Sequence, residues 1–127
     1  FATQSNRDQS ARRGLSFPKE ARLRRRADFQ KLYERGFRVP GPFAAAICLD
    51  SKQQRPGRAG FAVPRALGSS VVRNRLKRRL REAVRLNLDQ LEAGWDIVFQ
   101  ARSAALKAPF DELKRAVEGV FSRCRRS

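Results

Sequence analysis

Residues 71–92 constrain the fold of this chain more than any other segment. Their apolar side chains recur at spacings of three and four residues, which is the period of a helix with one buried face. At about 100° per residue, these side chains fall within about 130° of arc on a helical wheel. They are Val72, Leu76, Leu80, Ala83, Val84 and Leu91. The pattern predicts a helix that Ser69 or Ser70 caps, that runs to about Glu92 and that ends at Gly94.

A second amphipathic helix is predicted near the C-terminus, where Pro109 suits the first turn. Its apolar residues form a single stripe, made of Phe110, Leu113, Val117, Val120, Phe121 and Cys124. Neither helix can bury its apolar face alone, and a β-sheet is a surface that such faces commonly cover. The two helices therefore indicate that the rest of the chain supplies a sheet.

Segments with the composition of strands fill the intervals between the predicted helices. Residues 37–50 hold a short strand, a turn rich in Pro and Gly, and a longer strand over about 43–49. Further strands are predicted over 58–64 and over 95–102, the last being rich in aromatic and β-branched residues. The polar sequence "SKQQRPG", residues 51–57, is predicted to form a hairpin loop.

The sequence "ADFQKLYERG", residues 27–36, predicts a short first helix with Asp28 as its N-cap and Gly36 at its end. The predicted order is α-β-β-β-α-β-α, and the predicted fold class is α+β, a two-layer sandwich. We expect a single domain over residues 17–127. Residues 1–16 are polar and basic, and we expect them to be a flexible tail.

The polar side of the helix predicted over residues 71–92 indicates a polyanionic partner. Glu82 is the one acidic residue between positions 71 and 88, and repulsion between like charges opposes a helix by about 0.2–0.5 kcal/mol per pair. The chain has 29 Lys and Arg against 12 Asp and Glu, a formal charge of +17, which favours nucleic acid as the counter-charge. The candidate binding residues are Arg73, Asn74, Arg75, Lys77, Arg78, Arg81 and Arg85. The alternative is a charged face that contacts only solvent.

Several classes of function lack support in the sequence. The chain contains no His, and its carboxylates are scattered without metal-ligand spacing, so we expect no catalytic residue and no metal site of its own. Cys48 and Cys124 lie in apolar patterns and are expected to be buried free thiols, as in a reducing cytoplasm. No apolar run approaches the roughly 18 residues that a membrane span needs, so we expect no membrane partner.

Rival interpretations of the basic helix remain open at this point. "RNRLKRRLREA" loosely resembles the basic region of a leucine-zipper DNA-binding protein, but Leu86, Leu88 and Leu91 do not supply heptads. A general RNA-binding or ribosome-associated protein would also explain the charge. A membrane-active helix would carry aromatic bulk opposite its cations, which this one lacks.

The sequence "GRAGFAVPRALGSSVVRNRLKRRLREAVR", residues 57–85, resembles the signature of the bacterial ribonuclease P protein. The resemblance rests on Arg73, Asn74, Arg75, Lys77, Arg78 and Arg81 after a strand and a Gly-containing loop. "ADFQKLYERG" is similar to the first helix of that family, and "WDIVFQAR" to its last strand. Together these similarities cover roughly residues 20–124.

The resemblance implies a particular function and particular partners. The protein would be the accessory subunit of a ribonucleoprotein endoribonuclease, monomeric without RNA and cytoplasmic. Its partner, ribonuclease P RNA, would hold the catalytic Mg²⁺ and remove the 5′ leader from precursor tRNA. The basic helix would contact that RNA. The resemblance also implies that the β-α-β crossover is left-handed, against the usual rule.

The resemblance further implies that a cleft between the first helix and the sheet holds the single-stranded leader. Phe29 and Tyr33 are one helical turn apart and could stack on leader bases, although either could instead be core. Arg22 and Arg65 match positions at the edge of the cleft, although either could be a solvated charge. The candidate leader-cleft residues are therefore Arg22, Phe29, Tyr33 and Arg65.

Overall fold

The computed structural model describes residues 18–124, which form a four-stranded sheet and three α-helices joined by short 3₁₀ turns. The order of elements confirms the predicted α-β-β-β-α-β-α arrangement in this part of the chain. The strands are β1 (Phe37–Val39), β2 (Ala44–Asp50), β3 (Arg58–Ala62) and β4 (Trp95–Ala101). The helices are α2 (Arg26–Arg35), α3 (Ser70–Leu86) and α4 (Phe110–Arg123).

The sheet is mixed, with the strand order β1-β2-β4-β3. β4 pairs with β2 in antiparallel fashion and with β3 in parallel fashion. All residues of β4 except Gln100 are buried, because helices cover both faces of this central strand. Residues 51–57 therefore do not close a hairpin, and that prediction was wrong. The physical reason is that the most apolar strand, which comes last in sequence, takes the central place between β2 and β3.

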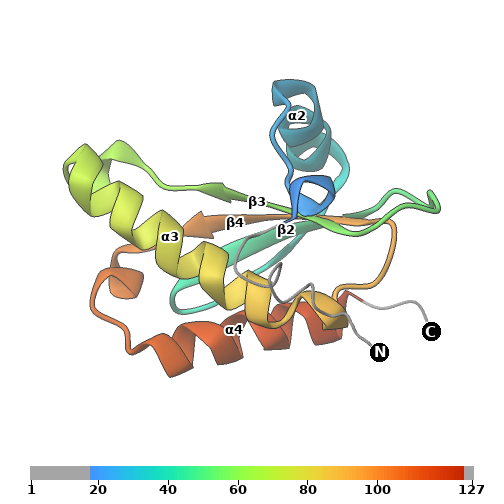
Figure 1. The fold of residues 1–127 in the computed structure, drawn as a ribbon. Helices are drawn as coiled ribbons and strands as arrows, with labels where there is room; N and C mark the ends of the chain where they lie inside the picture. Colours follow the sequence, from blue (N-terminus) through green and yellow to red (C-terminus); the bar gives the residue numbers. More distant parts are fainter. Residues whose placement is uncertain (1–17, 125–127) are drawn as a thin grey trace.

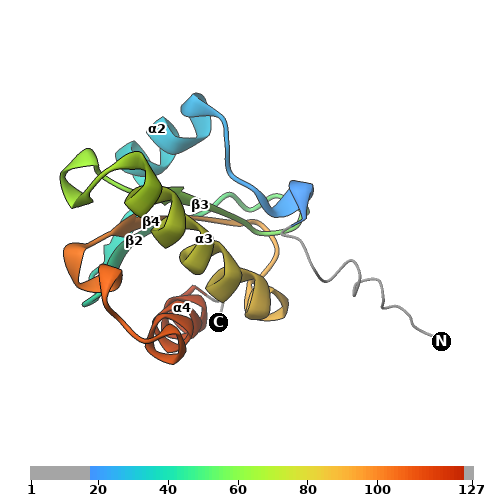
Figure 2. The same ribbon diagram turned by 60° about the vertical axis from the view of Figure 1, so that its left-hand side comes forward.

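The helices lie on both faces of the sheet. α3 and α4 lie side by side on one face, and α2 crosses the opposite face (Figures 1 and 2). The apolar faces predicted for the two long helices are the ones that are buried, as expected for a helix layer on a sheet. The chain passes from β3 through α3 to the parallel strand β4, and this crossover winds left-handed, as Figures 1 and 2 show together. The α+β class and the crossover of the resembled family are thus confirmed.

The core is divided by the sheet into two regions. On the side of α3 and α4, Phe99 packs near Phe121 with ring centroids 6.2 Å apart, and Cys48 and Cys124 are buried free thiols in the same cluster. On the side of α2, Leu32 is fully buried and packs with Leu23 and Val98. Leu32 is the one buried residue of α2, so most of the helix surface stays open.

Two helix boundaries differ from the prediction. α3 ends at Leu86 rather than near Glu92, because the buried Asn87 side chain donates from Nδ2 to the Ala83 carbonyl at 3.1 Å and to the Lys114 carbonyl at 3.0 Å. A short 3₁₀ turn, Leu88–Gln90, then follows.

At the start of α2, the N-cap position belongs to Arg25, and Asp28 lies within the first turn, where it pairs with Arg58 instead of capping. At the start of α3, Ser69 is the N-cap, and its hydroxyl accepts from the Val72 amide at 3.4 Å.

The tail predicted over residues 1–16 lies outside the described residues. Within residues 18–124, no helix has both the length and the apolar character that a membrane span requires.

Candidate nucleic-acid interface

α3 presents a basic surface to solvent because its apolar residues face the sheet. Leu76 and Leu80 are 2% exposed, which fixes the rotation of the helix on the core. The side chains on the opposite side are exposed, namely Asn74, Arg75, Arg78 and Arg81. Arg73 and Lys77 flank them and are half-buried. These predicted binding residues thus lie together on the solvent side of α3, where they can offer several charged donors to phosphate oxygens.

Arg85 differs from the other predicted binding residues because it has an acidic partner. Its guanidinium donates to the Glu82 carboxylate at 2.8 and 2.6 Å. This hydrogen bond lowers the pKa of the Glu82 carboxyl, although partial burial opposes the effect. The charge of Arg85 is therefore locally compensated, and it contributes less to an anion-binding surface than Arg78 does.

Two further arginines of α3 hold neighbouring loops. Arg79 donates to the carbonyl of Ala105 at 3.4 Å and to that of Ala108 at 2.5 Å, so it attaches α3 to the segment before α4. Arg73 donates from Nε to the Gly68 carbonyl at 3.1 Å. The sequence does not distinguish these roles, because an Arg that donates to a backbone carbonyl and an Arg that binds a phosphate give the same helical pattern.

A pocket of about 270 Å³ lies where α2, β3 and α3 meet, and we name it the cleft pocket. Its lining brings together two predicted leader-cleft residues, Arg22 and Phe29, and two predicted RNA-binding residues, Lys77 and Arg81. Arg24, which the sequence analysis missed, also lines it. A concave surface with two aromatic rings, those of Phe29 and Phe61, and several cations can hold a single nucleic-acid strand by stacking and by phosphate contacts.

Gly60 makes the floor of the cleft pocket flat. A Cβ at this position would lie 2.8 Å from Cζ of Phe29 and 3.0 Å from the Leu23 carbonyl oxygen. The bare glycine therefore lets the Phe29 ring rest on the sheet, where it packs against the cluster of Leu23, Leu32 and Val98. Phe29 thus contacts the core and also lines the pocket.

The other two leader-cleft candidates do not line the cleft pocket. Tyr33 is 47% exposed on α2, one turn beyond Phe29, so it is a surface residue and not core. Arg65 is exposed in a 3₁₀ turn between β3 and α3. Two of the four candidates, Arg22 and Phe29, therefore share the pocket, and the other two lie outside its lining.

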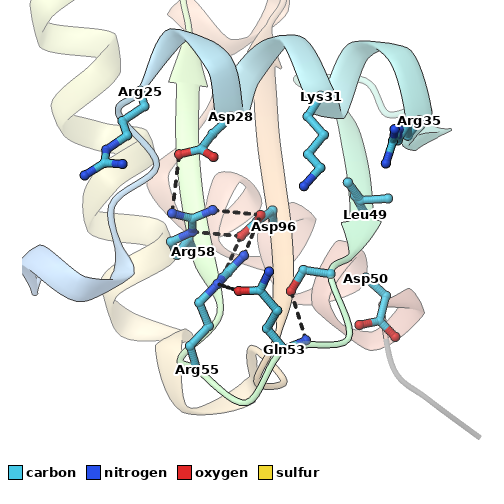
Figure 3. Close-up of a pocket in the computed structure, with 11 residues that line it drawn as sticks. Arg25, Asp28, Lys31, Arg35, Leu49, Asp50, Gln53, Arg55, Arg58 and Asp96 are labelled. Carbon is cyan, nitrogen blue, oxygen red and sulfur yellow. Dashed lines mark hydrogen bonds and ion pairs between the residues drawn. The ribbon is translucent and has the colours of Figure 1, made fainter.

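A partly buried ion-pair network attaches the start of α2 to the sheet (Figure 3). Asp96 on β4 accepts two hydrogen bonds from Arg55 and two from Arg58, all at 3.0 Å. Arg58 also reaches the Asp28 carboxylate on α2 at 3.4 Å. Burial raises the pKa of Asp96, but the hydrogen bonds from Arg58 and Arg55 outweigh burial and hold the pKa below its ordinary value. The network fixes the position of α2, and hence of Phe29, over the sheet.

Comparisons with known proteins agree on one family. A family model described as Ribonuclease P matches residues 17–125. The ribonuclease P protein component of Symbiobacterium thermophilum is 48% identical over 105 residues, which are 83% of this chain and 91% of that protein. The corresponding protein of Acidothermus cellulolyticus is 41% identical over 107 residues, covering 84% and 89%.

Solved structures show the same similarity. The ribonuclease P protein of Thermotoga maritima superposes with a TM-score of 0.74 at 26% identity, covering 83% of this chain and 98% of that one. The Staphylococcus aureus protein superposes with a TM-score of 0.72 at 27% identity, covering 84% and 97%.

Proposed function

The chain belongs to the ribonuclease P protein family, and from this premise we propose that α3 binds the catalytic RNA of the particle through its exposed basic side. The supporting observation is the exposed set of Asn74, Arg75 and Arg78 opposite the buried Leu76 and Leu80. Such a surface meets phosphates without unfolding any part of the core. The family implies an RNA partner and a subunit of a ribonucleoprotein endoribonuclease that acts in tRNA processing.

We propose that the 5′ leader of precursor tRNA lies in the cleft pocket and continues along α2 past Tyr33. Phe29 offers a ring fixed on the sheet, and Arg22, Lys77 and Arg81 offer cations around it. Leader bases would stack on the aromatic rings, while leader phosphates would contact the cations. Arg65 would contact the strand at the end near the start of α3.

In this proposal the protein binds and orients RNA, and the RNA partner holds the Mg²⁺ ions that support cleavage of the leader. Within residues 18–124, no three side chains of His, Cys, Asp or Glu are grouped so that they could hold a metal ion. The protein would act in the cytoplasm, as a monomer until RNA binds.

A competition experiment separates this proposal from a general RNA-binding role. Labelled ribonuclease P RNA is bound to the protein and displaced by either the same RNA or an unrelated structured RNA of equal length. We expect the unrelated RNA to compete at least about tenfold less well, because non-specific binding uses charge alone. Equal competition by both RNAs would favour the general RNA-binding or ribosome-associated alternative.

A further inference from the structure

We propose a second RNA-contact site, in which Lys31, Arg35 and Gln53 bind a phosphodiester group of an RNA backbone. These residues line a pocket of about 300 Å³ between α2 and the loop of residues 51–57, which we name the loop pocket (Figure 3). It is lined by a different side of α2 from the cleft pocket. The inference rests on the proposed function, because the RNA partner supplies the phosphate.

The floor of the loop pocket is held together by ion pairs and is electrically balanced. Arg55 and Arg58 share the Asp96 carboxylate, and Arg58 also contacts Asp28. Two cations and two carboxylates therefore neutralise one another, and their hydrogen bonds hold both the loop and α2 in place. A ligand charge would be recognised by the groups above this floor, since the charges within it are already satisfied.

The rim above this floor carries uncompensated positive charge. Lys31 and Arg35 are one helical turn apart on α2, and neither forms an ion pair within the described part of the chain. Of the nearby acids of the helix, Asp28 pairs with Arg58, and Glu34, which accepts from Gln30 at 3.2 Å, does not line the pocket. Figure 3 shows the Lys31 side chain extending from α2 toward the network. A cation held over a concave surface attracts anions more strongly than one on a flat surface.

Gln53 adds a neutral donor whose orientation is fixed. Its Oε1 accepts from Nε of Arg55 at 3.1 Å, so its amide nitrogen is left free to donate toward the pocket. Asp50 also lines the pocket, but its carboxylate accepts from the Lys52 amide at 2.9 Å, and Figure 3 shows it turned away from Lys31. Two cations and one amide donor thus surround a space of adequate size for a phosphate, and that combination selects an anion rich in acceptor oxygens.

The phosphate can belong to the catalytic RNA or to precursor tRNA, and the test has one arm for each. The double variant Lys31→Ala, Arg35→Ala is compared with the control Arg38→Ala, Arg115→Ala, which removes the same charge from exposed positions on β1 and α4. The first arm measures binding of the protein to ribonuclease P RNA as a function of salt. The second arm measures binding of the holoenzyme to precursor tRNA over the same range of salt.

We expect the double variant to reduce the slope of log affinity against log salt by about 1.4–1.8 in one of the arms, and the control to leave it unchanged. The arm that changes identifies the source of the phosphate. Gln53→Glu places a carboxylate among the donors without removing a cation, and we expect it to weaken binding several-fold in the same arm.

The inference is overturned if the double variant keeps the full slope in both arms, or if the control reduces it equally. If the wild-type protein still prefers ribonuclease P RNA over unrelated RNA in that case, the proposed function stands. A wild-type protein without that preference would overturn the proposed function and this inference together.

Discussion

Tyr33 shows how one residue's exposure separates two roles that the sequence left open. Its neighbour Leu32 is fully buried and attaches α2 to the sheet, whereas Tyr33 is 47% exposed. We predict that Tyr33→Ala weakens holoenzyme binding to precursor tRNA by about 1–3 kcal/mol, the value of a base stacked on an aromatic ring. Binding of mature tRNA, which has no leader, should be unchanged.

Leu32→Ala provides the matched control on the same helix. It should reduce the free energy of unfolding by about 2–5 kcal/mol, because it leaves a cavity under α2. Tyr33→Ala should change that free energy by only about 0.5 kcal/mol, as is usual at the surface. Both variants are measured by urea unfolding and by tRNA binding. Equal weakening for both tRNAs with Tyr33→Ala would remove Tyr33 from the leader path.

Asp96 makes stability depend on pH in the acid range. Its folded-state pKa is lowered, so its contribution is present above the ordinary Asp value of about 3.9 and is lost as pH falls through the folded-state pKa. We predict that Asp96→Asn lowers the free energy of unfolding by about 3 kcal/mol at neutral pH, since two arginines lose their shared carboxylate.

The variant should also lose part of the wild-type decline in stability below about pH 4. Unfolding is followed by urea titration at several pH values, with Asp111→Asn as the control because Asp111 is an exposed acid on α4. Wild-type and Asp96→Asn curves that run parallel through the acid range would show that the network does not lower this pKa.

At the scale of the element, α3 combines a packing face and a binding face. We predict that Arg75→Ala with Arg78→Ala reduces the salt slope for ribonuclease P RNA binding by about 1.4–1.8, because each lost phosphate contact removes about 0.7–0.9. Both side chains are exposed, so thermal unfolding should not change. Arg85→Ala should reduce the slope by less than either single variant, because Glu82 already compensates that charge. A reduction of the slope by Arg85→Ala that equals the reduction by Arg75→Ala or Arg78→Ala would contradict the compensating role of Glu82.

The elements were predictable where their signal is local. The period of the apolar residues identified α3 and α4 and the faces that they bury, and strand composition located β2 and β4. The place of β4 between β2 and β3 was not predictable, because pairing between distant strands leaves no local pattern. The early end of α3 depends on contacts from the Asn87 side chain to a carbonyl on another helix, which no window along the sequence contains.

The candidate site was predictable in part for the same reason. The basic side of α3 follows from helical spacing alone. One pocket, however, combines residues of distant elements, namely Lys77 and Arg81 with Arg22 and Phe29. This combination depends on how α2 and α3 meet across β3. The network that unites Asp28, Arg58 and Asp96 spans three elements, so its members look like ordinary surface charges in the sequence.

At the scale of the whole molecule, a charge of +17 on 127 residues makes an anionic partner part of the stability of the protein. A ligand that binds the folded state alone stabilises it in proportion to the logarithm of its concentration. We predict that ribonuclease P RNA at 100 times its dissociation constant raises the free energy of unfolding by about 2.7 kcal/mol, measured by thermal or urea unfolding. An unchanged free energy of unfolding in the presence of RNA would show that the RNA does not bind the folded state in preference to the unfolded state.

The central claim is that the protein assists cleavage by an RNA partner, and reconstituted cleavage tests it most directly. Purified protein, ribonuclease P RNA and precursor tRNA are combined at an Mg²⁺ concentration too low for the RNA alone, and release of the 5′ leader is measured over time. We predict specific cleavage when protein and RNA are both present, and intact precursor with the protein alone. Specific 5′ cleavage by the protein alone, or no increase in the rate when it joins the RNA, would contradict the account.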